Sequence, residues 1–513
     1  MAKVLDNYGI ISVPFKFNVD KSVWNDIESL MPKKMWFKKY QNGEKDFDCR
    51  YLNNNIVSMF TNSGDSKTIC KLYEINQDYL SNLPQDDKLY AINCDNRLSI
   101  ISKRIIIENG KEIEKSTEIA KANVVKTTLL LFYSNIGFLN FVFHIDTDSI
   151  EKFTEAMYLL NQAKRKEFVE LSYSVKRKKH TTYMYELIPL LINYFPECSS
   201  FDTDTKNFVN PDFLNNNILS FSNLILDKYS SNIPKYAVLI GNNQRDSYLS
   251  IINEKDLFRP FENRLWAISL NGVACIENMT GKEKSDRYFF YRLQSDNFSE
   301  KFNLTYFYLF LLRQHQRYYL RHKEEIYAKM LYSSDEKDLY KLEKKLTDLY
   351  EESMMMKIEC DFSHPSSISH INEYDENVKK HLYIDEDSKH FIELSKELSN
   401  YASLIRQRND FMLQSEKEIN EREKDLRLLQ LSKAGKIGTA VWTTIVTGFE
   451  GFSFLPRVFN DYRNLIVQLL VGLLVGGVTL HTQIIAIGNT NTEIEKQISE
   501  IEELKKQRNK KAN

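Results

Sequence analysis

The chain has 513 residues and a formal net charge of −1, and 42% of its residues are hydrophobic and 27% charged. This composition predicts a folded protein of two or more domains, excludes wholesale disorder, and provides no global basic field for binding nucleic acid. Gly and Pro are scarce, at 16 and 10 residues, which favours long helices over a turn-rich all-β fold.

The first residues of the chain show no basic segment followed by an apolar run. We therefore expect no secretory signal and a soluble part that stays in the cytoplasm. The six cysteines are scattered and form no CxxC pair, which indicates a reducing compartment rather than a disulfide framework.

Residues 1–285 are predicted to form a cytoplasmic domain of the α+β or α/β class, in which strands and helices are mixed. Runs typical of strands occupy residues 89–93, 98–108, 127–132, 138–144 and 236–240. Helices are predicted over residues 149–168, where Asp148 can cap the first turn, and over residues 183–194. The order of the strands is left open.

Residues 286–386 are predicted to form a helical connector. An aromatic-rich helix is expected over residues 302–331 and a charged helix over 335–356, before a break that contains Pro365. Arg313, His315 and Arg317 lie within the aromatic-rich helix, where charged groups need partners. We interpret these three residues as a structural or inter-subunit network rather than a ligand site.

A long stalk helix is predicted over residues 387–436. Apolar residues recur every seventh position without a miss, at Phe391, Leu398, Ile405, Met412, Ile419 and Leu426. Such a seam predicts a helix packed along its length against a partner. In the middle of the helix the second position of the seven-residue repeat is polar, at Arg408, Ser415 and Arg422. This favours several helices packed around an axis that contains water. The alternative is a helix packed against its own chain.

Two apolar stretches follow, at residues 437–456 and 465–488, and each has the ~20 residues that a helix needs to cross a bilayer. They are separated by a short link, 457–464, and followed by a charged helical tail, 489–513. Basic residues flank the pair on the side of the termini, so we expect a two-span hairpin in the inner membrane with both termini cytoplasmic. Gly472 and Gly476 in the second stretch suit close helix packing.

Polar residues line one side of the first predicted span. Thr439, Thr443 and Thr447 recur every fourth residue, and Glu450 lies near the same face. An ionised carboxylate at membrane depth is costly unless it faces protein or water, and rings of such groups build cation pathways. We therefore expect these four residues to line a pore. In the alternative, the threonines bond to their own helix carbonyls and Glu450 reaches the outer interface.

The plan of the C-terminal part resembles that of a known superfamily. The resemblance covers roughly residues 302–488, and its most specific portions are LTYFYLFLLRQHQRYYLR (304–321) and FSHPSSISHINEYDENV (362–378), followed by the stalk. The chain is thereby similar to the CorA-like divalent-cation channels, and most similar to the CorA-like membrane proteins found beside type III CRISPR systems. This resemblance implies a homo-oligomer, pentameric in the parent family, whose first span lines the pore.

The chain departs from the parent family at the outer end of the first span. The family's Gly-Met-Asn signature is absent, and residues 448–452 read GFEGF instead. Since that signature binds hydrated magnesium in the parent family, magnesium selectivity is in question and a divalent cation is left open. The resemblance to the CRISPR-linked members implies opening by a nucleotide second messenger, an S-adenosylmethionine–AMP conjugate in that group.

Two groups of residues in the first domain are candidates for binding an anionic nucleotide. Cations bind phosphate and aromatic rings stack on bases. The first group is the basic run Lys176, Arg177, Lys178 and Lys179, and the second is Arg259, Arg264 and Trp266. The alternative for both is an ordinary solvated surface.

Metal and enzyme motifs give no support for a catalytic centre. The spacing of Cys360, His364 and His370 fits no standard zinc pattern, and the P-loop, Rossmann, HExxH and GxSxG motifs are absent. We expect no enzyme, no tightly bound cofactor and no direct contact with nucleic acid.

Three functions are consistent with these patterns. The first is a ligand-gated channel that causes membrane leakage in antiviral defence, with the lipid membrane, a small anionic nucleotide and further copies of the chain as partners. The second is a constitutive transporter of magnesium or other divalent cations. The third is a membrane-anchored enzyme or scaffold whose hairpin is only a tether.

Overall fold

The computed structural model divides the chain into two compact units. The first comprises Met1–Tyr332 and Ser353–Leu394, and the second comprises Ser333–Glu352 and Ser395–Asn513. The residues that the structure describes are 2–20, 22–32, 34–38, 52–60, 69–108, 111–162, 169–175, 178–199, 218–244, 257–280, 305–332, 344–345, 347–348, 350–351, 354, 362, 364–454 and 463–512.

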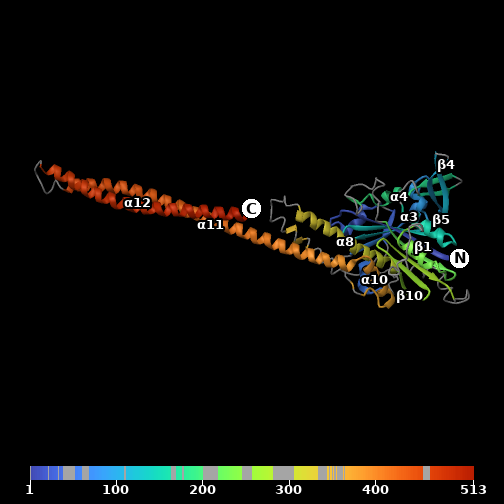
Figure 1. Ribbon diagram of the computed structural model, residues 1–513. Helices are drawn as coiled ribbons and strands as arrows, with labels where there is room; N and C mark the ends of the chain where they lie inside the picture. Colours follow the sequence, from blue (N-terminus) through green and yellow to red (C-terminus); the bar gives the residue numbers. More distant parts are fainter. Residues whose placement is uncertain are drawn as a thin grey trace. The chain divides into compact units, whose positions relative to one another are not determined.

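A large mixed sheet forms the framework of the first unit (Figure 1). Among the described residues its strands follow the order β10-β11-β12-β9-β1-β6-β5-β4-β7-β8, while β3 pairs with β5 and β2 pairs with β3. The strands are β1 (Val4–Lys16), β2 (Trp36–Lys38), β3 (Cys70–Ile75), β4 (Leu98–Glu108), β5 (Lys111–Phe132), β6 (Ile136–Asp146), β7 (Val169–Val175), β8 (Lys178–Thr182), β9 (Leu219–Leu226), β10 (Leu257–Phe261), β11 (Arg264–Ile268) and β12 (Gly272–Asn278).

Most neighbouring strands are antiparallel, whereas β9 and β12 pair in parallel, with Phe221 opposite Val273. The connection between these two strands contains a helix, α5 (Ile233–Gly241), as a parallel crossover requires. The other helices that the structure describes in the first unit are α1 (Asn54–Phe60), α2 (Gln77–Ser81), α3 (Ile150–Asn161), α4 (Met184–Ile192), α8 (Phe307–Tyr332), α10 (Ser369–His381), and the 3₁₀ helices η1 (Trp24–Leu30) and η3 (Lys88–Ile92).

Both faces of the sheet are buried, so its central strands are apolar on both sides. On one face Ile11 of β1 belongs to the same core as Phe153 and Met157 of α3. On the other face Ile10 of β1 belongs to the core that contains α8 and α10. Helices α8 and α10, which lie within the predicted connector 286–386, therefore cover this face of the sheet within the first unit.

Several predicted elements are confirmed at their positions. Strand β4 covers residues 98–108 as expected, and β5 and β6 contain the runs 127–132 and 138–144. Helix α4 lies within the predicted helix 183–194. Helix α3 covers the first part of the predicted helix 149–168, and residues 163–168 lie outside the described residues.

Two predicted strands and one predicted cap are wrong. Residues 89–93 lie largely in η3, because the Asp87 side chain accepts a hydrogen bond from the Leu89 backbone and starts a turn. Residues 236–240 lie in α5, since a short apolar run does not distinguish a strand from a buried helix. The cap of α3 is Ser149 rather than Asp148, with the Ser149 hydroxyl accepting from the Lys152 backbone.

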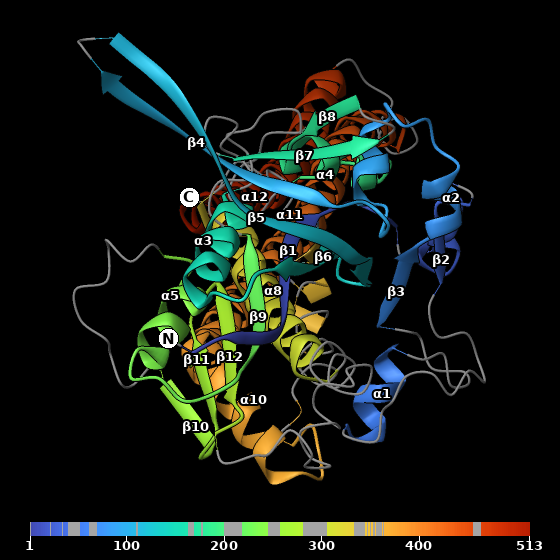
Figure 2. The ribbon, with the colours of Figure 1, turned by 90° about the vertical axis from the view of Figure 1, so that its right-hand side faces the viewer.

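Strands β4 and β5 extend beyond the body of the sheet as a two-stranded ribbon (Figure 2). Their pairing continues to Glu108 opposite Lys111. The ribbon exposes apolar side chains, among them Ile107, of which 75% is accessible to solvent.

Two long helices dominate the second unit. Helix α11 (Ile384–Phe454) begins in the first unit and covers both the predicted stalk and most of the first predicted span. Helix α12 (Arg463–Ala512) covers the second predicted span and the charged tail. Within the second unit the two helices lie side by side as an antiparallel hairpin (Figure 1).

Candidate functional site: a helical hairpin and a buried charge network

The charged part of the hairpin is held together by ion pairs and a narrow apolar seam. Arg422 of α11 pairs with Glu500 of α12, and Lys505 donates to Glu423 with 2.8 Å between Nζ and Oε1. The hydrogen bond from Lys505 keeps the pKa of Glu423 below its ordinary value. The polar seam position at Arg422 is therefore satisfied by the C-terminal helix of the same chain.

Apolar seam residues lie close to these pairs along both helices. Ile419 of α11 and Ile494 and Ile501 of α12 are buried. Three- and four-residue steps separate Ile494, Gln497, Ile501 and Leu504, as they do in a coiled coil. In this part of the helix the seam is packed against its own chain, which is the alternative that the sequence left open.

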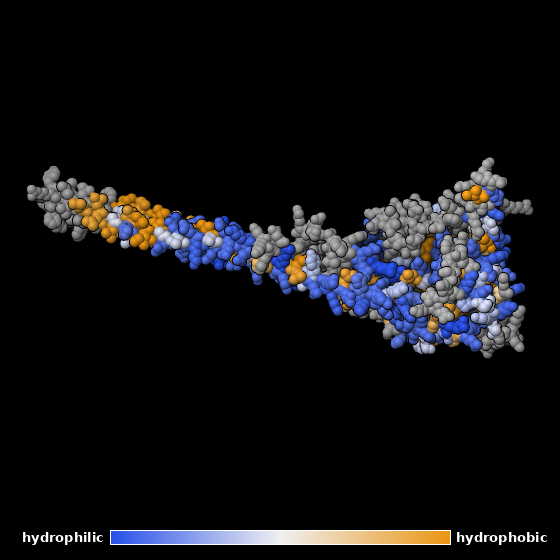
Figure 3. Space-filling view, in the orientation of Figure 1, coloured by the Kyte–Doolittle hydropathy of each residue, from blue (hydrophilic) through white to orange (hydrophobic). Residues whose placement is uncertain are grey.

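The other part of the hairpin exposes apolar side chains on both helices. Figure 3 shows hydrophobic residues gathered over this stretch and hydrophilic residues over the charged part. The exposed apolar residues are Ile437, Val441, Trp442 and Ile445 of α11, and Leu470, Leu473, Leu474, Val478, Leu480, Ile484 and Ile485 of α12. A contiguous apolar surface of this kind marks a site of contact with lipid or with another protein.

Within the part of the chain that the structure describes, no helix combines the length and the hydropathy needed to cross a membrane. Residues 455–462, at the join of the two predicted spans, lie outside the described residues, as do the side chains at 447–454, 463–469, 471, 472 and 475.

Polar side chains in this apolar part form hydrogen bonds within and between the helices. Thr439 donates to the carbonyl groups of Gly435 and Lys436, and Thr443 donates to that of Thr439. Gln483 of α12 donates to the Thr443 hydroxyl at 3.4 Å. Both threonine hydroxyls thus donate hydrogen bonds to carbonyl groups of α11, and both side chains remain exposed on its surface. The predicted pore residues Thr447 and Glu450 have side chains outside the described set.

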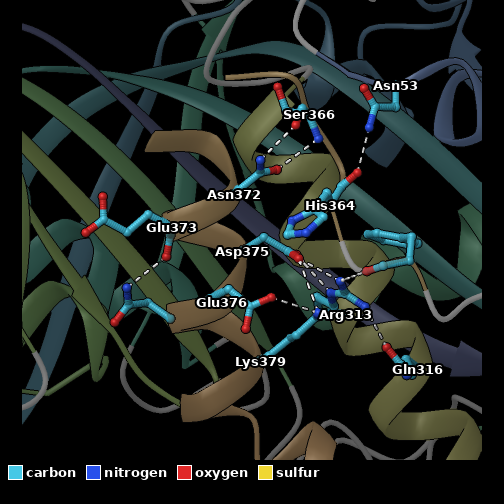
Figure 4. Close-up of polar contacts among 12 residues, drawn as sticks. Asn53, Arg313, Gln316, His364, Ser366, Asn372, Glu373, Asp375, Glu376 and Lys379 are labelled. Atoms are coloured by element: carbon cyan, nitrogen blue, oxygen red, sulfur yellow. Dashed lines mark hydrogen bonds and ion pairs between the residues drawn. The ribbon is translucent and has the colours of Figure 1, made fainter. Parts of the chain in front are cut away.

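A buried charge network joins helices α8 and α10 in the first unit. Arg313 makes a two-pronged ion pair with Asp375, with Nε–Oδ1 and Nη2–Oδ2 distances of 2.8 and 2.6 Å, and both side chains are 0% exposed. The Arg313 guanidinium also donates to the Phe362 carbonyl and to Gln316, and lies 4.0 Å from the centre of the Phe362 ring (Figure 4). Lys379 pairs with Glu376 at 3.0 Å beside Asp375.

Each arm of this network fixes a different segment. Arg313 ties α8 to α10 and to the backbone at Phe362. A short distance along that backbone, the carbonyl groups of His364 and Pro365 accept hydrogen bonds from the side chain and backbone of Asn53 (Figure 4). The network therefore organises the elements from which α11 emerges, and its partners belong to one chain.

Gln314 and Arg317, on the same helix, donate to the Leu270 carbonyl at 2.7 and 3.1 Å. Leu270 lies in the turn between β11 and β12. Two side chains of α8 therefore donate hydrogen bonds to the same carbonyl group of the sheet. Arg313 and Arg317, two of the three residues that the sequence assigned to a structural or inter-subunit network, thus have hydrogen-bond partners within the chain.

His315 is fully buried against the sheet. Its ring stacks on Phe132 with 3.8 Å between centroids, and its Nε2 shares a hydrogen bond of 2.7 Å with the Ser134 hydroxyl. Burial lowers the pKa of His315 to about 3. The imidazole is therefore neutral in the folded state at neutral pH.

The first unit should lose stability as the pH falls below about 6.5. Between about pH 6.5 and pH 3, His315 is protonated in the unfolded state but remains neutral in the folded state. The expected slope from this residue approaches about 1.4 kcal/mol per pH unit in that window. Thermal unfolding followed by fluorescence of Trp24, Trp36 and Trp266 measures it. His315→Gln should be less stable at neutral pH but show a shallower decline. An equal decline in both proteins would contradict this role.

The candidate nucleotide-binding residues are not gathered in one place. Lys178 and Lys179 lie exposed on β8, whereas Lys176 and Arg177 fall outside the described residues. Arg259 is exposed on β10.

Arg264 and Trp266 are buried instead of exposed. Arg264 pairs with Glu277 at 3.1 Å, and Trp266 packs against Tyr306 and Tyr374. Neither side chain reaches a ligand without rearrangement of the core. Sequence alone gave no sign of this, because the burial of every residue of β11 and the pairing of Arg264 with Glu277 both depend on tertiary contacts.

No group of three or more His, Cys, Asp and Glu side chains suited to a metal ion occurs within the described ranges. Cys360 lies outside them. Comparison of the chain with protein-family models, with curated proteins and with solved structures finds no match.

Proposed function

We propose that the chain is one subunit of a ligand-gated membrane channel. In this proposal the apolar part of the hairpin is inserted in a bilayer and the α/β unit binds the ligand that opens the channel. The observation that carries it is the exposure of apolar side chains on both helices of one stretch of the hairpin, next to a stretch whose surface is charged. Water is a poor solvent for the first surface and a good one for the second.

Polar groups within the apolar stretch favour a channel over a simple anchor. Thr443 and Gln483 contact each other across the hairpin, and an anchor surrounded by lipid has no need for either. Thr439 and Thr443 are exposed, even though Gln483 of α12 contacts Thr443, so both hydroxyl groups remain able to accept hydrogen bonds from water in an assembled pore.

The ligand belongs in the α/β unit because α11 begins there and continues into the hairpin. A ligand shifts a closed–open balance only through different affinities for the two states. The resemblance to the CRISPR-linked proteins suggests a nucleotide messenger of the S-adenosylmethionine–AMP type and an antiviral role through leakage. Lys178, Lys179 and Arg259 are the exposed candidates for its phosphate.

A membrane tether for an enzyme or scaffold is the second candidate. It is favoured by the hydrogen bonds of Thr439 and Thr443 to their own helix carbonyls, which satisfy both hydroxyl donors without a pore.

Ion flux from liposomes separates these functions. The purified chain is reconstituted and flux is measured with and without candidate nucleotides, for the wild type, Thr443→Leu and Glu450→Ala. A channel should give nucleotide-dependent flux that Thr443→Leu reduces several-fold. Thr482→Leu is the matched control, since Thr482 is an exposed threonine of α12 that also bonds to its own helix.

Other outcomes assign other functions. Magnesium flux without nucleotide would indicate the constitutive transporter. Absence of flux together with nucleotide turnover would indicate an anchored enzyme, and the channel proposal would then be wrong.

A further inference from the structure

One side of α11 carries a stripe of apolar and glycine residues that no described part of the chain covers. It consists of Leu428, Leu431, Gly435, Gly438, Trp442 and Ile445, which we call the glycine stripe. Steps of three and four residues alternate along it, so all six residues share one face of the helix.

The residues of the glycine stripe are open to solvent. The exposed fractions are 64% for Leu428 and 69% for both Leu431 and Trp442, and a Cβ atom built at Gly435 or Gly438 meets nothing within 4 Å. In contrast, Ala440, on the side that faces α12, is 4% exposed. One apolar face of α11 is therefore buried in the hairpin, whereas a second apolar face stays exposed.

Lipid alone does not account for this second face. Leu428 and Leu431 lie before the apolar stretch, in a part of α11 whose neighbouring side chains are charged, such as Lys424, Arg427 and Lys433. A bilayer that takes up Trp442 and Ile445 leaves Leu428 and Leu431 in the aqueous or headgroup region. An occupant that covers the whole stripe has to be an elongated protein element, and the alternating steps are those of helix packing.

The charges next to the stripe point to a copy of the same helix. Glu421 and Lys424 continue the stripe toward the N-terminus, are both exposed, and carry opposite charges three residues apart. Two parallel copies of α11 can pair Glu421 of one with Lys424 of the other. Parallel alignment is also what copies inserted in one membrane with the same orientation require.

We propose that the glycine stripe is the surface through which α11 contacts a second copy of this chain, with the closest approach at Gly435 and Gly438, where the absence of side chains lets backbones come together. This inference deepens the proposed function by assigning the contact between subunits. Thr439 and Thr443 lie roughly a quarter of a turn from the stripe, by helical geometry, so the contact leaves them beside it rather than within it.

Cysteine cross-linking in membranes tests the assignment. Gly438→Cys and Leu431→Cys are introduced singly into the full chain and treated with a short bis-maleimide, which bridges helices whose axes are ~8–10 Å apart. Both should give a dimer band well above that of the wild type, whose six native cysteines set the background. Gln430→Cys is the matched control, because Gln430 is exposed next to Leu431 but points to another side of α11.

Equal cross-linking of Gln430→Cys and Gly438→Cys, or no increase over wild type at either stripe position, would overturn the proposal. Leu431→Glu provides a second measurement, since it should shift the detergent-solubilised chain to smaller assemblies while Gln430→Glu does not. Cross-links without ion flux would support the contact between copies at the glycine stripe and count against the channel. Ion flux without cross-links at the stripe would support the channel and count against this contact.

Discussion

Asp375→Asn is expected to lower the free energy of unfolding of the first unit by about 3–5 kcal/mol, because it leaves the Arg313 guanidinium charged and half-paired inside the fold. Both side chains are 0% exposed, and the carboxylate accepts two charge-assisted hydrogen bonds from the guanidinium. The Phe362 carbonyl and Gln316 remain as acceptors, but neither supplies a negative charge. Thermal or denaturant unfolding followed by fluorescence of Trp24, Trp36 and Trp266 measures the loss.

An exposed ion pair in the same unit is the matched control. Arg97 and Asp146 are joined at 3.0 Å, close to the distance in the buried pair, but their side chains are 71% and 56% exposed. Asp146→Asn should therefore cost less than about 1 kcal/mol. If the two variants were destabilised equally, burial of the Arg313–Asp375 pair would not be what makes it costly to break.

A double variant distinguishes loss of a favourable pair from the cost of an orphaned charge. Arg313→Met with Asp375→Asn removes both charges, so it should be more stable than Asp375→Asn alone. A double variant less stable than both single variants would contradict the orphaned-charge explanation.

Part of this network could be predicted from the sequence, and part could not. Arg313 lies among apolar and aromatic residues of a helix, which is enough to predict that its charge needs a partner. The identity of that partner depends on the packing of α8 against α10, 62 residues later in the chain. The sequence also predicted a break near Pro365 but not that α10 follows it at Ser369.

The strands show the same division. Residues 98–108 are recognisable because β-branched residues recur over a length that suits a strand. Residues 236–240 are also rich in apolar side chains but form α5, since the local pattern does not reveal that this segment crosses between the parallel strands β9 and β12. Which apolar segments pair is decided by contacts remote in sequence.

The long helix illustrates why a seam does not identify its partner. The seven-residue repeat predicted a packed helix, and the polar position at Arg422 favoured a wet axis between subunits. In the structure Glu500 of α12 pairs with Arg422 instead. The repeat specifies that α11 has a partner helix, but it is equally compatible with a helix of the same chain and with a helix of another copy. In this part of the hairpin the pairs Arg422–Glu500 and Glu423–Lys505 form within one chain.

Replacing Leu474 and Val478 together by lysine should move the chain from the membrane to the soluble or aggregated fraction. These side chains are 67% and 59% exposed, lie four residues apart on one side of α12, and sit near the middle of the apolar stretch 465–488. A lysine at the centre of a bilayer costs about 3 kcal/mol on insertion scales, so two of them oppose insertion strongly. Flotation with liposomes and extraction of cell membranes measure the partition.

The matched control is Ile498→Lys, since Ile498 is also an exposed apolar residue of α12, at 40%, but belongs to the charged part of the hairpin. It should leave the partition unchanged, because its side chain meets water in either fraction. Fluorescence of Trp24, Trp36 and Trp266 verifies that the first unit stays folded in every variant. If the double lysine variant floated with liposomes as the wild type does, the apolar surface of the hairpin would have to be covered by protein rather than lipid. The glycine stripe could then still join copies of the chain, whereas the contact of Leu474 and Val478 with lipid would be ruled out.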